Sequence, residues 1–164
     1  MLLAHRYPDR ILSLTSVEGN FTLNDAFMTS RIAAMSDLEA DALLQQRRET
    51  PEAWLQSQGI DPLPGRIELA RHWLNKQNGR TIVAMSRSVL NVTGHPSYLD
   101  KVREVFASPV PVHLIAGERS RAGWDVPDWA LHEAASMTIL PATGHMMMLE
   151  DPAAFAAAVR ANVF

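Results

Sequence analysis

Three short apolar runs stand out along the chain because each is rich in aliphatic or β-branched side chains and is bounded by turn residues. They cover residues 11–17, 110–116 and 137–140. Apolar runs of this length, set between Gly, Pro, Asn or Asp, are typical of buried strands. We therefore predict three strands, one near the start of the chain and two in its last third.

The long segment between the first two runs has the spacing of helices instead. Residues 22–106 contain no alternating or continuous strand pattern, and Ser36 with Glu39 forms a capping box that starts a helix. Apolar positions then recur three or four residues apart. Helices are expected over about 24–35, 36–48, 50–59, 67–79, 81–92 and 96–106.

After residue 107 the two remaining strands alternate with helices, expected over about 127–135 and 152–162. Alternation of strands and helices predicts a parallel sheet, and therefore the α/β class. The helical segment is too long for a simple crossover between two strands. We expect residues 1–21 and 107–164 to form the sheet domain and residues 22–106 to form an inserted cap or lid.

Composition and charge narrow the classes of function. The chain has 164 residues, 47% of them apolar and 20% charged, as in an ordinary globular domain with one core. A net charge of −3 without a basic stripe argues against a nucleic-acid partner. No apolar run reaches the ~18 residues of a membrane span, and the start does not resemble a signal peptide. We expect a cytoplasmic protein.

Metal and cofactor chemistry finds little support. The chain has no cysteine, which excludes disulfides, thiol catalysis and thiolate metal sites. His132-Glu133 begins like a zinc motif but lacks the second His, and the other histidines have no ligand spacing. There is no Gly-rich phosphate loop. We expect neither a metal nor a cofactor.

Polar residues of types that take part in catalysis follow two of the predicted strands. Glu18 comes directly after the first strand, and His145 follows the third strand after a turn through Gly144. Ligands of open α/β sheets bind at the carboxyl ends of the strands. Taken singly, however, Glu18 is equally well explained as a turn-stabilising acid, and a lone His is more often a structural loop residue.

Three segments together resemble the α/β-hydrolase fold enzymes. Residues 6–10 are similar to the segment after that family's nucleophile helix, and residues 109–118 are similar to its penultimate strand. Residues 140–145, followed by 150–152 and Phe155, are similar to its catalytic-histidine loop and terminal helix. The segments occur in the family's order, with helices where the family carries a cap. The resemblance implies a partial α/β-hydrolase fold containing strands six, seven and eight.

The resemblance also implies a function and its residues. The family contains serine hydrolases of carboxylic esters and similar small acyl substrates, and His145 would be the catalytic base. The usual acid position after strand seven is Ser120 in this chain, but some members, haloalkane dehalogenases among them, carry the acid after strand six. Glu18 stands at that place and is the preferred partner. Asp125 and Glu118 are the alternatives.

Two family features are missing from the sequence. There is no Gly-x-Ser-x-Gly nucleophile elbow and no oxyanion-hole loop. Because nucleophile, base and oxyanion hole act as a unit, we expect this chain alone to be inactive. The alternative is a non-catalytic ligand-binding or association module. Without preceding strands, the first strand would expose an apolar edge, so we expect self-association or pairing with an N-terminal fragment.

Overall fold

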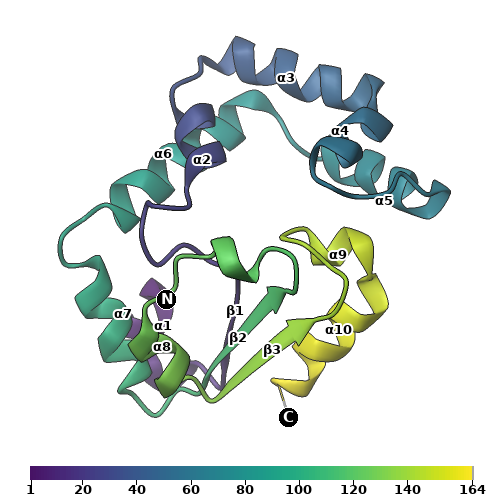
Figure 1. The fold of residues 1–164 in the computed structure, drawn as a ribbon. Helices are drawn as coiled ribbons and strands as arrows, with labels where there is room; N and C mark the ends of the chain where they lie inside the picture. The colour runs from purple at the N-terminus through teal and green to yellow at the C-terminus, as the bar shows by residue number, and fades with distance from the viewer. Residues whose placement is uncertain (164) are drawn as a thin grey trace. The chain divides into compact units, whose positions relative to one another are not determined.

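Three parallel strands form one sheet in the order β1-β2-β3 (Figure 1). The computed structural model describes residues 1–163 and confirms the α/β class. The strands are β1 (Leu14–Val17), β2 (Val112–Gly117) and β3 (Ser136–Leu140). β1 and β3 each pair in parallel with β2, which is therefore the central strand.

The first strand begins later than its apolar pattern predicts. Pro8–Arg10 form a 3₁₀ turn, η1, and the strand starts only at Leu14. Leu12 is 90% exposed, so the apolar run that it belongs to does not all enter the sheet. The predicted start at residue 11 is wrong because pairing with β2 begins at Leu14, opposite Val112.

One face of the sheet is covered by the last helices of the chain. α9 (Met147–Glu150), a short helix that the sequence did not predict, precedes α10 (Pro152–Ala161). Pro152 fits the first turn of α10, and the side chain of Asp151 accepts a hydrogen bond from the Ala154 N–H at 2.8 Å. Ile115 of the central strand packs beneath these helices with Leu140 and Met147. This cluster fixes the loop after β3 against the sheet.

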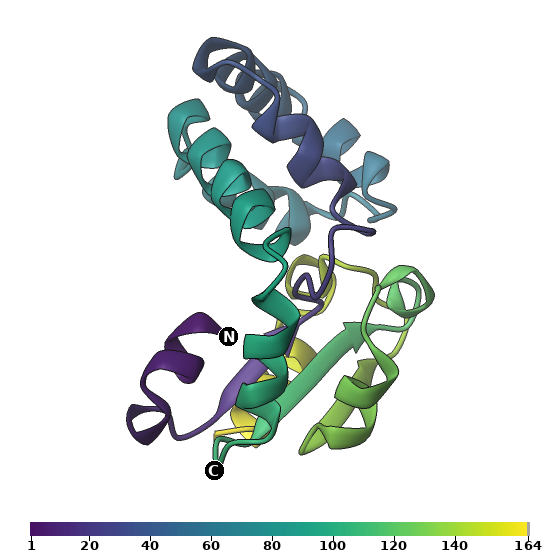
Figure 2. The same cartoon turned by 90° about the vertical axis from the view of Figure 1, so that its left-hand side faces the viewer.

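Three other helices pack together beside the sheet, on the side away from α10 (Figure 2). They are α1 (Leu2–Arg6), α7 (Tyr98–Phe106) and α8 (Asp128–Glu133). Between α8 and the end of β2 lies a short 3₁₀ turn, η2 (Arg121–Gly123). The Tyr98 hydroxyl of α7 donates a hydrogen bond to the Asn20 carbonyl at 3.1 Å, which ties α7 to the loop after β1.

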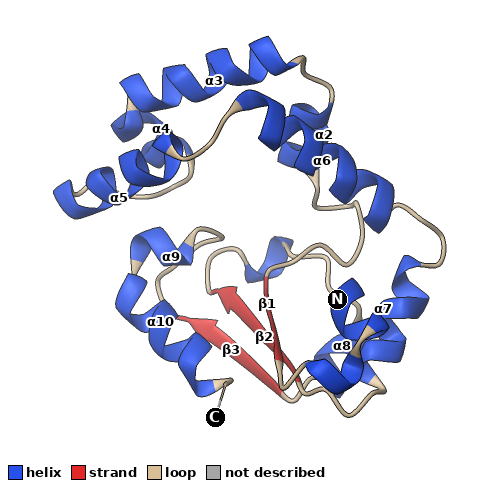
Figure 3. Cartoon of the chain, turned by 180° about the vertical axis from the view of Figure 1, so that it is seen from behind, coloured by secondary structure: helices blue, strands red, loops and turns tan. Residues whose placement is uncertain are grey.

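The segment from Ala26 to Val92 is a second compact unit, made of helices (Figure 3). They are α2 (Phe27–Ala33), α3 (Asp37–Glu49), α4 (Pro51–Ser57), α5 (Pro64–Asn75) and α6 (Gly79–Thr93). The predicted capping box is present: the Ser36 side chain accepts from the Glu39 N–H, and Glu39 accepts from the Ser36 N–H at 2.7 Å. Ile32, Ala40 and Val83 form part of its core.

Gly79 has a different role from the one predicted. The sequence places it at the end of a helix, but α5 ends at Asn75 and Gly79 begins α6. A Cβ atom on Gly79 would lie 2.2 Å from the Asp37 carbonyl oxygen. Its N–H donates to the Asp41 carboxylate at 2.5 Å, so the glycine permits a close backbone contact with α3.

The helical unit is shorter than predicted, because it spans Ala26–Val92 instead of residues 22–106. The sheet unit comprises Met1–Asp25 and the chain from Thr93 onward. It therefore includes α7, which the sequence placed in the insertion of residues 22–106. α7 belongs to the sheet unit because it packs against α1 and α8.

No helix in the described part of the chain, residues 1–163, combines the length and the apolar character needed to cross a bilayer.

Candidate active site

Glu18 and His145 meet at the carboxyl ends of the strands. The Glu18 Oε2 atom lies 2.7 Å from the His145 Nδ1 atom. Glu18 directly follows β1, and its N–H donates to the Ile115 carbonyl of β2 at 3.0 Å. His145 lies in the loop between β3 and α9. The two residues that the sequence singled out are therefore in direct contact, although β2 separates their strands.

The Glu18 carboxylate is buried and uses both of its oxygens. Its side chain is only 3% exposed. Oε1 accepts hydrogen bonds from the Gly117 N–H at 2.9 Å and from the Ser120 hydroxyl at 2.5 Å, while Oε2 faces His145. These contacts fix the orientation of the carboxylate.

The pKa values of the two groups move in opposite directions. Burial by itself would raise the pKa of Glu18, but the hydrogen bonds from His145, Ser120 and Gly117 outweigh it and hold that pKa below its usual value. The hydrogen bond to Glu18 raises the pKa of His145, and the negative charge of Asp25 adds to this effect. The ionised carboxylate and a basic imidazole therefore stabilise each other.

The imidazole is oriented with one nitrogen engaged and the other available. A carboxylate only accepts hydrogen bonds, so neutral His145 carries its proton on Nδ1 and leaves the Nε2 lone pair open. The His145 side chain is 69% exposed, and no residue among 1–163 hydrogen-bonds its Nε2 atom. This nitrogen can accept a proton from a nucleophile or a water molecule.

Backbone strain is concentrated at the same place. Glu18 has a φ of +38° and Ala142 has a φ of +56°, and these are the only non-glycine residues with positive φ among residues 1–163. Such a conformation costs on the order of 1–3 kcal/mol and persists only where surrounding contacts impose it. One strained residue is the acid itself, and the other lies three positions before His145.

A glycine at the end of β2 lets the histidine loop approach the sheet. A Cβ atom on Gly117 would lie 2.4 Å from the Gly144 carbonyl oxygen and 2.7 Å from that of Thr143. Any side chain at position 117 would push the loop away from the strand. Gly117 thus sets the distance between β2 and the residues that carry His145.

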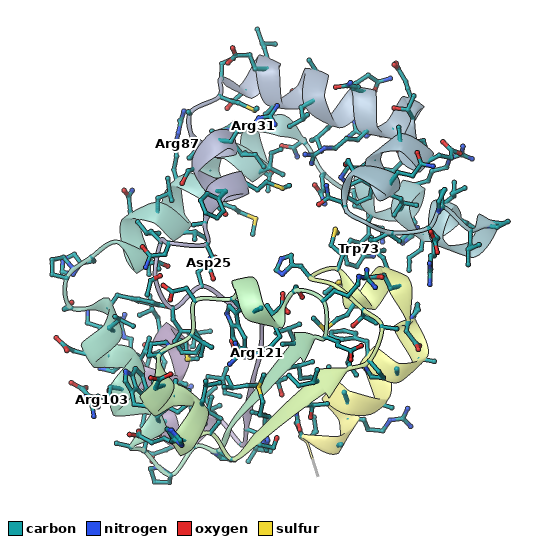
Figure 4. All side chains as sticks on the ribbon, viewed as in Figure 1. Asp25, Arg31, Trp73, Arg87, Arg103 and Arg121 are labelled. Atoms are coloured by element: carbon teal, nitrogen blue, oxygen red, sulfur yellow. The ribbon has the colours of Figure 1, made fainter. Side chains whose placement is uncertain are left out.

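Asp125, the alternative acid, is engaged elsewhere. Its carboxylate accepts hydrogen bonds from the Thr22 hydroxyl and, at 2.8 Å, from the Asn24 amide. Its own N–H donates to the Asp25 carboxylate at 3.0 Å, and Asp25 is labelled in Figure 4. These contacts tie Asp125 to the loop after β1 and do not include His145.

Glu118, the other alternative, also binds backbone instead of the imidazole. Its Oε2 atom accepts a hydrogen bond from the Ala142 N–H at 2.7 Å. Gly117 and Ser120, by contrast, were not predicted from the sequence to bind Glu18. The available signal was that the Gly-Glu-Arg-Ser turn follows β2 at the same sheet edge as Glu18.

No group of three or more His, Asp or Glu side chains able to hold a metal ion occurs within residues 1–163. The chemistry that the pair can perform by itself is proton transfer.

Comparison with known proteins adds information on the fold only. No protein-family model matches the chain, and no curated protein matches its sequence. Among solved structures, the chain is similar to Cfl2 wild-type from Burkholderia cenocepacia, with a TM-score of 0.58 and 18% sequence identity. The match covers 96% of this chain and 59% of that one. The chain therefore spans about three-fifths of the length of this neighbour and shares its fold over that part.

Proposed function

We propose that this chain is the part of an α/β-hydrolase that carries the catalytic base and its acid partner. His145 is the base and Glu18 the acid. The observation that supports this most directly is the 2.7 Å contact between Glu18 and His145 Nδ1 at the carboxyl ends of a parallel sheet. A buried carboxylate that orients an exposed imidazole is the arrangement used to activate a hydroxyl nucleophile.

The reaction that follows is hydrolysis of a small carboxylic ester. His145 Nε2 takes the proton of a serine hydroxyl as its oxygen attacks the acyl carbon, and the imidazolium then gives that proton to the departing alkoxide. Water attacks the resulting acyl-serine, passing its proton to Nε2 and from there to the serine oxygen. In both steps Glu18 remains ionised, accepts the hydrogen bond from the His145 Nδ1–H group and stabilises the imidazolium.

The nucleophile and the oxyanion hole must come from another segment. The sequence lacks a Gly-x-Ser-x-Gly elbow, and the Ser120 hydroxyl already binds Glu18. A base and acid without these groups lose nearly all rate enhancement. The purified chain is therefore expected to hydrolyse p-nitrophenyl acetate no faster than its His145→Ala variant.

The first test is the coding sequence upstream of the Met1 codon, in all three frames. A nucleophile elbow shortly before Met1 supports the proposal. The protein encoded by that longer frame should then hydrolyse p-nitrophenyl acetate, with kcat reduced at least ~100-fold by His145→Ala or Glu18→Gln and little changed by Asp125→Asn. Hydrolysis by the longer protein that survives His145→Ala would contradict the catalytic role of this residue, as would esterase activity of the short chain that depends on His145.

One observation favours the alternative of an association module. β1 pairs only with β2 among the described strands. The N–H of Leu14 donates to the Pro111 carbonyl just before β2, and that of Glu18 donates to the Ile115 carbonyl of β2, so by alternation those of Thr15 and Val17 point to the open edge. Such an edge is a template for another strand. Sedimentation velocity of the purified chain tests this role: a dimer supports it, and a monodisperse, cooperatively folding monomer contradicts it.

A further inference from the structure

The loop that carries His145 is held by charged side chains through its backbone. The Gly144 N–H donates to Glu150 Oε1 at 2.6 Å, and the Ala142 carbonyl accepts a hydrogen bond from the Arg119 guanidinium. The backbone N–H of Arg119 also donates to the Thr143 carbonyl, at 2.9 Å, and this contact does not depend on the arginine side chain. Of the three residues before His145, Ala142 is therefore bound by the side chain of Arg119, which follows β2, and Gly144 by the side chain of Glu150, at the end of α9, whereas Thr143 is bound by the backbone of Arg119.

Arg119 and Glu150 also bind each other. The Arg119 guanidinium lies 2.6 Å from Glu150 Oε2, so Glu150 uses one oxygen for Arg119 and the other for the Gly144 N–H. The Glu150 side chain is only 6% exposed, whereas that of Arg119 is 44% exposed. A buried carboxylate is costly unless it is paired and hydrogen-bonded. The Arg119 guanidinium supplies the opposite charge for Glu150, and the Gly144 N–H supplies a further hydrogen bond.

The loop needs such external support because its own conformation is unfavourable. Ala142 is held at a φ of +56°, which an L-residue seldom adopts. Its N–H is bound by Glu118 and its carbonyl by Arg119, so both backbone polar groups of the strained residue are satisfied by side chains from the end of β2. A Cβ atom on Gly144 would lie 3.3 Å from both the Arg119 guanidinium and Glu150 Oε1, which shows how closely the pair approaches the loop.

We propose that Arg119 and Glu150 are positioning residues whose side chains hold the backbone of Ala142 and Gly144 and thereby keep His145 Nδ1 in contact with Glu18. The catalytic meaning of this arrangement rests on the proposed function, whereas the positioning itself does not. Two sets of contacts then converge on the histidine: Glu18 fixes the imidazole from the side of β1, and the Arg119–Glu150 pair fixes the preceding backbone from the side of α9.

The test uses variants that change the pair and keep its packing. Arg119→Met retains the aliphatic stem without its donors, Glu150→Gln retains the shape without the charge, and Arg119→Lys restores a positive charge. The control is Arg71→Met in the other compact unit, because the same substitution there removes an exposed ion pair, that of Arg71 with Glu52 at 3.3 Å. NMR on the purified chain supplies two readouts, the pKa of the His145 imidazole and the hydrogen-exchange rate of the Gly144 amide.

We expect Arg119→Met to move the pKa of His145 at least halfway toward its value in Glu18→Gln. We also expect the Gly144 amide to exchange about tenfold faster, because the loop opens locally. In Arg119→Lys the His145 pKa and the Gly144 exchange rate should lie closer to their values in the unsubstituted protein than in Arg119→Met. Arg71→Met should change neither readout. A folded Arg119→Met or Glu150→Gln variant with an unchanged His145 pKa and unchanged Gly144 exchange would overturn the proposal.

These readouts separate the positioning role from the proposed function. If the pKa and exchange rate respond as expected but no form of the protein that contains this chain hydrolyses esters, the positioning stands and the hydrolase proposal fails. If hydrolysis depends on His145 but neither readout changes in the Arg119 and Glu150 variants, the hydrolase proposal stands and the positioning proposal fails.

Discussion

Glu18 and His145 are 127 residues apart in the sequence, yet their side chains meet through a 2.7 Å contact between Oε2 and Nδ1. The acid of this pair is almost fully buried, and the base is mostly exposed. The two residues therefore differ in role: the protein fixes the carboxylate, and the imidazole exposes its second nitrogen. Four consequences can be measured.

Glu18, and not Asp125, should control the basicity of His145. Replacing Glu18 by Gln removes the hydrogen-bonding carboxylate that raises the pKa of His145, so that pKa should fall toward the ordinary value of 6.5. Asp125→Asn should leave it nearly unchanged, because the Asp125 carboxylate binds Thr22 and Asn24. An NMR titration of the imidazole compares the two variants. A larger pKa change in Asp125→Asn would show that the acid has been misassigned.

Ser120 should keep the Glu18 carboxylate ionised. Its hydroxyl donates to Glu18 Oε1 at 2.5 Å, so Ser120→Ala should raise the pKa of Glu18 and destabilise the fold by about 1–3 kcal/mol. Carboxyl-detected NMR and urea denaturation measure these effects. The control is Ser57→Ala, whose hydroxyl donates to the Trp54 carbonyl at an exposed position and should change stability by less than ~0.5 kcal/mol. Equal effects of the two substitutions would argue against a role for Ser120 at the site.

The pair should stabilise the protein most strongly in mildly acidic solution. The pKa of Glu18 is lowered on folding, so its contribution is complete above its ordinary value of 4.5 and is lost as the pH falls through the lowered pKa. The pKa of His145 is raised, so its contribution is complete below 6.5 and is lost as the pH rises through the raised pKa. Both contributions are complete only between pH 4.5 and 6.5.

Urea denaturation at several pH values checks this window through the coupling energy of a double-mutant cycle with Glu18→Gln and His145→Gln. The coupling should be larger at a pH between those two values than at alkaline pH. A coupling energy that does not change with pH would mean that ionisation of His145 adds nothing to the contact.

Gly117 should tolerate no side chain. In Gly117→Ala the new methyl group would meet backbone oxygens of Thr143 and Gly144, which must shift as a unit. We expect a loss of about 1–3 kcal/mol in the free energy of unfolding and a weaker Glu18–His145 contact, seen as a lower His145 pKa. In the control Gly123→Ala, a Cβ atom has no neighbour within 4 Å. A Gly117→Ala variant as stable as Gly123→Ala would show that the loop can move away at no cost.

Much of the fold could be predicted from local patterns because strand and helix signals are local. The apolar runs placed three strands, and their alternation with helices predicted the parallel sheet that the structure contains. Ser36 with Glu39 marked a helix start that is present, and the helix expected from residue 152 begins at Pro152. Glu18 and His145 were found because each follows directly on a strand or its turn, and parallel strands bring such ends to one edge.

Other features depend on contacts between segments far apart in the chain, which no local pattern contains. The pattern could not place the start of β1 at Leu14, because pairing with Val112 sets it, or show that Gly79 begins a helix under the constraint of Asp37. The sequence preferred Glu18 over Asp125 only through a resemblance, and the contact itself depends on which carboxylate reaches the imidazole across the sheet. The hydrogen bonds of Arg119 and Glu150 to the loop of residues 142–144 likewise form only when β2, β3 and α9 are packed together. Hydrogen bonds of about 2.5 to 3 Å require that packing.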